Sequence, residues 1–156
     1  MSNTIRDFET EFIGRKVSNL YVQRTNVGKD NKNVCQKKLK CYTCHPKKYV
    51  KNHTFYSEGI FNFHFDLTNR PLIIITPNKH VETTLDLSKD EIYEMFVIVD
   101  NFCKDRNIKD YQLITNMGAW KTHQHLHWKL KINEDTCFRM KQDHFKLIKL
   151  EKNYAV

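Results

Sequence analysis

Residues 123–130 read HQHLHWKL and place three of the chain's eight histidines at alternate positions. Successive side chains of a β-strand point to opposite faces, so this spacing predicts that His123, His125 and His127 share one face of a strand. Such a spacing can also arise by chance. Clustered imidazoles, however, cost free energy unless a metal or an anion compensates their tendency to ionise. We therefore interpret the row as a catalytic or metal-binding device.

The length of 156 residues corresponds to one domain with a hydrophobic core that needs no disulfides. The first ten residues contain no apolar leader segment, and no stretch is apolar enough to span a bilayer. The number of cysteines is odd, five, so we expect reduced thiols rather than a disulfide framework. These features predict an intracellular protein, cytoplasmic or nuclear, with no membrane partner.

The formal net charge is +8, and lysines are concentrated between Lys29 and Lys51. A basic balance of this kind favours anionic partners, which include nucleotides, nucleic acid and acidic proteins. A lysine-rich surface that is merely solvated is an equally good interpretation, because charge describes association and not chemistry. Nucleic acid is therefore one candidate partner of this segment.

No repeat or linker divides the chain, and we expect an N-terminal extension over residues 1–40 followed by one domain with a C-terminal tail over residues 41–156. The extension has helical apolar spacing over 7–22 and the composition of a loop or mobile arm over 25–40. In the domain, alternation predicts a half-buried strand over 54–66, and a β-branched run predicts a central strand over 72–75.

A helix is predicted over 89–104, because Ser88 and Glu91 have the form of a capping box and apolar residues follow at helical spacing. Strands over 110–115 and 123–132 should form a hairpin around the turn at 116–118. The tail over 138–150 fits either a strand or a helix. Strands, a helix and then a hairpin predict an α+β domain with a mostly antiparallel sheet and a helix packed on one face.

Cys41 and Cys44 form a C-x-x-C pair, whose spacing allows two thiolates to hold one zinc ion, and the nearby lysines should favour deprotonation. Tetrahedral zinc needs two more ligands. His80 and His123 are candidates because each lies at an expected strand end, and His45 and Cys35 are the alternatives nearby in sequence. A redox pair is disfavoured, because His45 and the residues after it do not resemble a helix. Two ordinary reduced cysteines remain the simplest alternative.

In these elements the chain resembles the histidine triad (HIT) superfamily, in its zinc-containing branch. The family's apolar strand ending in Pro-x-x-His, its helix, its strand with an Asn-x-Gly turn, and its triad follow in the order seen here at 73–80, 85–104, 111–118 and 123–130. The resemblance covers roughly residues 41–132. It implies a HIT-like α+β fold with about five antiparallel strands. It also implies a purine-nucleotide pocket and a homodimer as a candidate state.

The resemblance further implies a nucleotide hydrolase or nucleotidyl transferase that acts at the α-phosphate of a nucleotide conjugate through a covalent nucleotidyl-histidine. By position, His125 is the expected nucleophile and His127 contacts the phosphate or the leaving group. Asp66 is the expected ribose contact, and Asn116 lies on the phosphate side. The expected structural zinc ligands are Cys41, Cys44, His80 and His123.

Two departures from the family pattern concern the substrate. The family has a Gly-Gln-Ser/Thr element before its triad, whereas this chain has a short turn at 118–122, where Lys121 and Thr122 are the replacement phosphate donors. Trp128 and Lys129 follow the triad where apolar residues are usual. Lys121 near the phosphates suits a more anionic substrate.

Two other functions fit the same residues. One is a basic zinc module that binds nucleic acid without turnover. An intermediate possibility is an enzyme that acts on adenylated or capped nucleic-acid ends, in which the lysines hold the polymer and the histidines do the chemistry. The other is a metal-dependent hydrolase in which all three histidines hold a catalytic ion. We rank it last because no nearby acid is placed as a general base.

Overall fold

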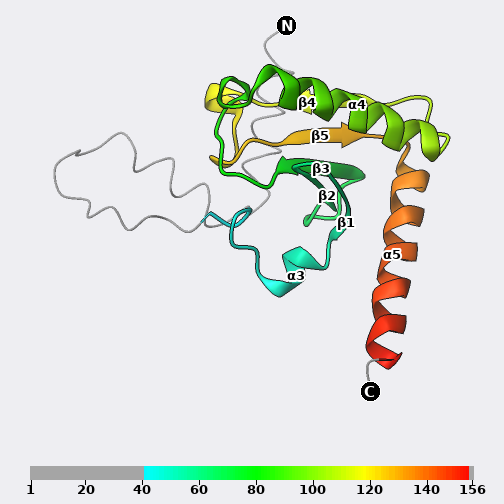
Figure 1. The fold of residues 1–156 in the computed structure, drawn as a ribbon. Helices are drawn as coiled ribbons and strands as arrows, with labels where there is room; N and C mark the ends of the chain where they lie inside the picture. Colours follow the sequence, from blue (N-terminus) through cyan, green and yellow to red (C-terminus); the bar gives the residue numbers. More distant parts are fainter. Residues whose placement is uncertain (1–40, 155–156) are drawn as a thin grey trace, which may run out of the picture. The chain divides into compact units, whose positions relative to one another are not determined.

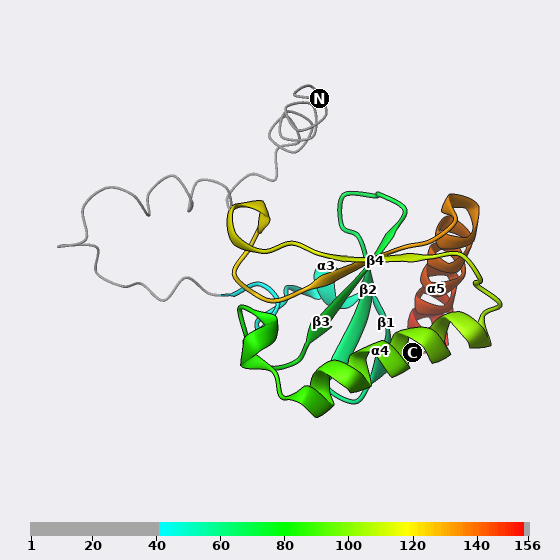
Figure 2. The ribbon, with the colours of Figure 1, turned by 90° about the horizontal axis from the view of Figure 1, so that it is seen from above.

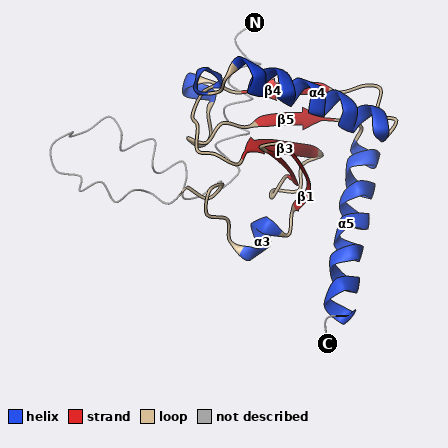
Figure 3. Ribbon diagram, viewed as in Figure 1, coloured by secondary structure: helices blue, strands red, loops and turns tan. Residues whose placement is uncertain are grey.

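The computed structural model describes residues 41–154 of the chain (Figure 1). Its elements, coloured by type in Figure 3, are α3 (Lys48–Lys51), β1 (Thr54–Glu58), β2 (Phe61–Phe65), β3 (Leu72–Pro77), a 3-10 turn η1 (Thr84–Asp86), α4 (Lys89–Asp105), β4 (Gln112–Thr115), a second 3-10 turn η2 (Gly118–Trp120), β5 (Trp128–Lys131) and α5 (Glu134–Tyr154). The predicted segments 7–22 and 25–40, together with Cys35 and the lysines before residue 41, lie outside the described residues. None of the helices within 41–154 is long and apolar enough to cross a membrane.

The five strands form one sheet in the order β1-β2-β3-β5-β4, and every neighbouring pair is antiparallel. The β-branched run at Ile73, Ile74 and Ile75 lies in β3, the central strand, where all three side chains are buried. Helix α4 runs along one side of the sheet (Figure 2). The expected α+β fold, with an antiparallel sheet and a helix on one face, is confirmed.

Alternation along the strands separates two faces of the sheet. One face carries Phe61, Phe63 and Phe65, which are at most 1% exposed, and it contributes to the main core together with α4. Phe102 of α4 is fully buried in this core, with its ring 4.8 Å from that of Phe63. The residues between the core positions belong to the opposite face, so β2 presents His64 there.

The predicted strand over 54–66 is two strands, β1 and β2, which form a hairpin. The chain turns at Gly59, whose φ of +55° lies in the left-handed region that glycine adopts without strain. A Cβ at this position would lie 2.5 Å from Oε1 of Glu94. The alternating apolar pattern continues through the turn, and the glycine is the feature that marks the break.

Helix α4 has the predicted capping box. The Glu91 N–H donates to Ser88 Oγ at 3.1 Å, and the Ser88 N–H donates to a Glu91 carboxylate oxygen at 2.8 Å. The tail, for which strand and helix both remained open, forms helix α5. Its His144 Nε2 donates to the backbone oxygen of Asn52 at 2.7 Å, so the helix is fixed to the chain just after α3.

The strand predicted over 123–132 is shorter than expected, because β5 begins only at Trp128. It pairs with β4 as the predicted hairpin. Residues 123–127 form a bent segment before the strand, so the alternation of a strand does not apply to the three histidines. The prediction that all three imidazoles share one strand face is therefore wrong, and the bend separates His125 from the other two.

Candidate metal centre and histidine cluster

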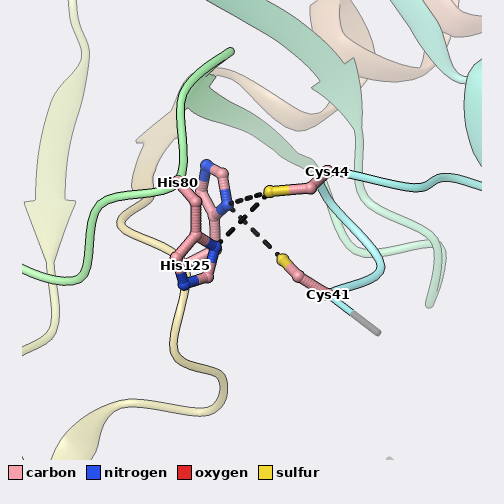
Figure 4. Close-up of side chains that lie close together, drawn as sticks. All are labelled: Cys41, Cys44, His80 and His125. Carbon is pink, nitrogen blue, oxygen red and sulfur yellow. Dashed lines mark hydrogen bonds between the residues drawn. The ribbon is translucent and has the colours of Figure 1, made fainter. Parts of the chain in front are cut away.

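Cys41, Cys44, His80 and His125 form a compact group in which one ligand atom of each lies within 4.8 Å of the others (Figure 4). Cys44 Sγ is 3.4 Å from His80 Nδ1 and 3.5 Å from His125 Nδ1. Cys41 Sγ is also 3.5 Å from His125 Nδ1. Two sulfurs and two imidazole nitrogens arranged in this way could hold a metal ion.

These four residues come from three parts of the chain. The two cysteines lie on a turn in which the His45 N–H donates to the Cys41 backbone oxygen at 2.9 Å. His80 follows the end of β3 at Pro77. Close by, the Leu126 N–H donates to the backbone oxygen of Val81 at 2.7 Å, and this bond holds the bent segment against the chain that leaves β3. The rings of His80 and His125 are consequently 5.2 Å apart.

The cluster contains His125 where the resemblance implied His123. Both ring nitrogens of His125 are engaged, since Nε2 donates to the Pro77 backbone oxygen at 2.8 Å and Nδ1 faces the two sulfurs. A hydrogen on Nε2 leaves the lone pair on Nδ1, which is the form a metal ligand needs. His125 is also only 1% exposed. The structure thus does not bring His123 to the cysteines, and it leaves His125 no free nitrogen for attack.

The electrostatics of the Cys44 thiol differ from the expectation that nearby lysines favour its deprotonation. Burial, followed by the neighbouring Cys41, raises the pKa of Cys44 to about 11. A cation between the sulfurs is the kind of charge that would offset this. Within the described part of the chain Cys41, Cys44, Cys103 and Cys137 are free thiols, as the cysteine count predicted.

His127 is held in one tautomer by the backbone. Its Nδ1 donates to the backbone oxygen of His125 at 3.1 Å, so the lone pair is on Nε2. Its own backbone oxygen accepts from Thr115 Oγ1 at 3.0 Å. Burial, more than any other factor, lowers the pKa of His127 to about 4, and the ring is therefore neutral at pH 7. A neutral, oriented imidazole with a lone pair on Nε2 is chemically a nucleophile or a base.

His123 stacks on His127, with ring centroids 4.2 Å apart and planes inclined by 16°. Burial, followed by the adjacent His127, lowers the pKa of His123 to about 3. Two stacked imidazoles are thus both neutral at pH 7. His123 lies beside the imidazole of His127 and outside the four-residue metal group.

Asp66 lies just after β2 and is 5% exposed. One carboxylate oxygen accepts from the backbone N–H of Thr68 and of Arg70 and from Arg70 Nε, and the other accepts from a second guanidinium nitrogen at 2.7 Å. Burial alone would raise the pKa of Asp66, but the bonds from Arg70 and Thr68 outweigh it and lower the pKa. The carboxylate therefore organises its own loop.

The other expected substrate contacts lie around the bent segment. Lys121 is 7% exposed, and its Nζ donates to the backbone oxygen of Glu82 at 2.5 Å, so this amine is engaged within the protein. Thr122 is partly buried and directly precedes His123. Asn116 is partly buried and follows Thr115, the residue that bonds to the His127 backbone. Asn116 is thus one residue away in sequence from a direct contact with the His127 backbone.

Sequence reasoning gave no role to His64 and Lys129. In the register of the sheet, His64 pairs with Ile74, which pairs with Lys129, so the three form a row across the face opposite α4. Lys129 and His64 both contribute to lowering the pKa of His127, which lies two residues before Lys129. The signal was present in the sequence, since His64 alternates with the core phenylalanines and Lys129 follows the triad at the same spacing.

The basic segment between Lys29 and Lys51 is described only in part. Lys47, Lys48 and Lys51, at and around α3, are exposed. No carboxylate occurs in the sequence between Cys41 and Glu58, so every charged side chain in this stretch is basic. Its role as a nucleic-acid contact stays a prediction.

No protein-family model and no curated protein matches the chain. Solved structures similar to it are HIT family proteins. One is a histidine triad protein from Clostridium difficile, with 19% identity over 60% of this chain and 90% of that chain and a TM-score of 0.49. Another is a HIT family hydrolase from Legionella pneumophila, with 16% identity, coverages of 59% and 91%, and a TM-score of 0.48. A third is a Plasmodium falciparum diadenosine triphosphate hydrolase, with 20% identity, coverages of 67% and 79%, and a TM-score of 0.48.

Proposed function

We propose that the chain is a hydrolase or nucleotidyl transferase that acts at the α-phosphate of a purine nucleotide conjugate, with His127 as the nucleophile. The observation that supports this most strongly is the bond from His127 Nδ1 to the backbone oxygen of His125. It fixes the tautomer in which Nε2 carries the lone pair, and it stabilises the imidazolium that forms when Nε2 bonds to phosphorus. This assignment replaces His125, whose nitrogens are both engaged.

The reaction has two steps. In the first, a bond forms between Nε2 of His127 and the α-phosphorus, the bond from phosphorus to the leaving group breaks, and the leaving group takes the electron pair. In the second, a water oxygen or an acceptor hydroxyl bonds to phosphorus, the Nε2–phosphorus bond breaks, and the proton of the attacking oxygen is released. His127 returns to its neutral form. Throughout both steps its Nδ1 keeps its proton, which stays hydrogen-bonded to the backbone oxygen of His125.

We further propose that the four-residue cluster holds structural zinc. A zinc ion with bonds of about 2.3 Å to sulfur and about 2.0 Å to nitrogen, at tetrahedral angles, separates those ligand atoms by about 3.5 Å. The three sulfur-to-nitrogen distances are 3.4, 3.5 and 3.5 Å. Four protein ligands leave no open position, which is typical of a structural site and disfavours the metal-dependent hydrolase. Bound zinc would hold His125 in place. Because the His125 backbone oxygen accepts a hydrogen bond from His127 Nδ1, the zinc would also help to orient the ring of His127.

The substrate contacts proposed from the resemblance remain Asp66 for the ribose and Asn116 and Thr122 for the phosphate. Oδ1 of Asp66 accepts one hydrogen bond, from Arg70, and its second lone pair would accept from a sugar hydroxyl. Lys121 is a weaker candidate, because its amine donates to Glu82.

The test compares two variants with the same change two residues apart, His127→Ala and His125→Ala. Each is assayed for nucleotide release from a nucleoside phosphoramidate, a dinucleoside triphosphate and a 5′-adenylated oligonucleotide, and its bound metal is measured. We expect His127→Ala to retain metal and a native unfolding midpoint while losing turnover by at least about 10³-fold. His125→Ala should lose both metal and stability. Wild-type turnover by His127→Ala would refute the assignment, and an inactive parent would favour a binding module.

A further inference from the structure

We propose that Lys129 determines the leaving group, and that it selects conjugates in which the nucleotide is joined to a second phosphate through a phosphoanhydride over conjugates joined to an amine. This inference rests on the proposed function, since it needs a nucleophile at His127. Two sources share the linkage, namely dinucleoside polyphosphates and nucleic-acid ends that carry a 5′-adenylate.

The position of Lys129 relative to His127 is the first argument. Lys129 lies in β5, two residues after His127, and its neighbours across the sheet are Ile74 and Ile114. Alternation places it on the face opposite the phenylalanine core, together with His64. His127 directly precedes Trp128, the first residue of β5. Two residues of chain span at most about 7 Å, and a lysine side chain is long enough to cover this distance. Its amine is therefore in reach of a phosphate group joined to a phosphorus that His127 attacks.

The charges around Lys129 are the second argument. The side chain is 8% exposed, which is unusual for lysine, and Arg70 and Asp66 are two charged groups that act on it. The Asp66 carboxylate is bonded to Arg70 through both of its oxygens. Burial, followed by the proximity of Arg70, lowers the pKa of Lys129. A cation beside a guanidinium in a buried position is stabilised by further negative charge, which a second phosphate supplies.

The chemistry of the leaving group is the third argument. When a phosphoanhydride breaks, the bridging oxygen departs as part of an anionic phosphate and needs no proton. A fixed positive charge stabilises this developing negative charge. An amine leaving group instead needs a proton on nitrogen as the bond breaks, and a general acid with a pKa near the working pH serves it best. A lysine at this position suits the first reaction, and a histidine would suit the second.

The experiment measures kcat/KM for the full chain on three substrates: a dinucleoside triphosphate, a 5′-adenylated oligonucleotide and a nucleoside phosphoramidate. The variants are Lys129→Gln, Lys129→Arg and Lys129→His, and the matched control is Lys131→Gln. The control removes the same charge from an exposed position on the same strand. Unfolding midpoints of all variants report whether the fold is retained.

We expect the parent to prefer at least one phosphoanhydride over the phosphoramidate by more than about 10-fold, and Lys129→Gln to lose about 100-fold on the anhydride and much less on the phosphoramidate. Lys129→Arg should keep the preference, Lys129→His should shift it toward the phosphoramidate, and Lys131→Gln should resemble the parent. Whichever anhydride is preferred identifies the source.

An active parent whose substrate ratio is the same in folded Lys129→Gln would overturn this inference and leave the proposed function standing. The same holds for an active parent that prefers the phosphoramidate. A parent that turns over none of the three substrates would overturn both.

Discussion

Replacing Asp66 by asparagine should destabilise the protein, because this nearly isosteric change removes a buried charge on which a whole loop depends. The carboxylate accepts hydrogen bonds from Thr68 and Arg70, and it forms an ion pair with the guanidinium of Arg70 at 2.7 Å. An asparagine amide presents a donor where the carboxylate has its second acceptor. One Arg70 nitrogen then faces another donor. The remaining hydrogen bonds to this side chain lose their charged acceptor and become weaker.

The size of the effect follows from the exposure of the pair. Breaking a buried ion pair by removing one partner costs about 3–5 kcal/mol. The Asp66 side chain is 6% exposed, but that of Arg70 is 25% exposed, so water takes over part of the guanidinium's hydrogen bonding. We therefore expect a loss of about 2 kcal/mol in the free energy of unfolding at pH 7, or a decrease of about 8 °C in the melting temperature for a domain of this size.

The loss should depend on pH in a defined direction. Hydrogen bonds from Arg70 and Thr68 outweigh the effect of burial and lower the pKa of Asp66 below its ordinary value of 3.8. Its stabilisation is therefore complete above the pKa of the unfolded chain and is lost as the pH falls through the lower folded value. The difference between parent and Asp66→Asn should be equal at pH 7 and pH 5, and it should shrink below about pH 4.

Urea unfolding followed by circular dichroism at these pH values measures the difference. The matched control is Asp143→Asn, since Asp143 faces Lys146 at 3.6 Å with both side chains more than half exposed. An exposed pair of this kind contributes less than about 0.5 kcal/mol. If Asp66→Asn were as stable as the parent at pH 7, or if its loss were the same at pH 3 as at pH 7, the reasoning about this loop would be refuted.

Two further pairs of variants test the core and the metal cluster. Phe102→Ala should cost about 3–5 kcal/mol, because the fully buried ring contacts Phe63, whereas Phe96→Ala on the same helix, at a residue 50% exposed, should cost under about 1 kcal/mol. Equal losses in urea unfolding would contradict the assigned core. The parent should bind one zinc ion per chain by mass spectrometry of bound metal, Cys44→Ser should lose it, and Cys103→Ser, at a buried thiol outside the cluster, should keep it. Retention of a full equivalent by Cys44→Ser would contradict the ligand set.

Local sequence signals predicted most of the fold. The capping box at Ser88 fixed the start of α4, and the isoleucine run in β3 identified the central strand, because both patterns depend on nearby residues alone. The turn at Gly59 was missed because the apolar alternation of β1 and β2 continues through it. In that segment a single glycine was the only sign of a hairpin.

The conformation of the histidine row could not be predicted from local sequence patterns. Its spacing fits a strand, but the bond between Leu126 and Val81 and the approach to the cysteine pair bend the chain before β5. Both contacts join segments that are about 45–85 positions apart in sequence, so no periodicity records them. The structure brings together the cysteine pair and His80, which are three of the four residues expected to share one metal site. The choice of His125 over His123 required the fold.

The most direct test of the central claim is to locate the covalent intermediate. The protein is mixed with a slight excess of a turned-over nucleotide conjugate and denatured during the first turnover at neutral or alkaline pH, because a phosphorus–nitrogen bond to histidine is labile in acid. Tryptic cleavage after Lys121 and Lys129 gives a peptide over residues 122–129 that contains all three histidines, so fragment-ion mass spectrometry is needed to distinguish them. We predict the nucleotidyl mass on His127 alone. The same mass on His125 or His123, or turnover without any modified peptide, would contradict the account.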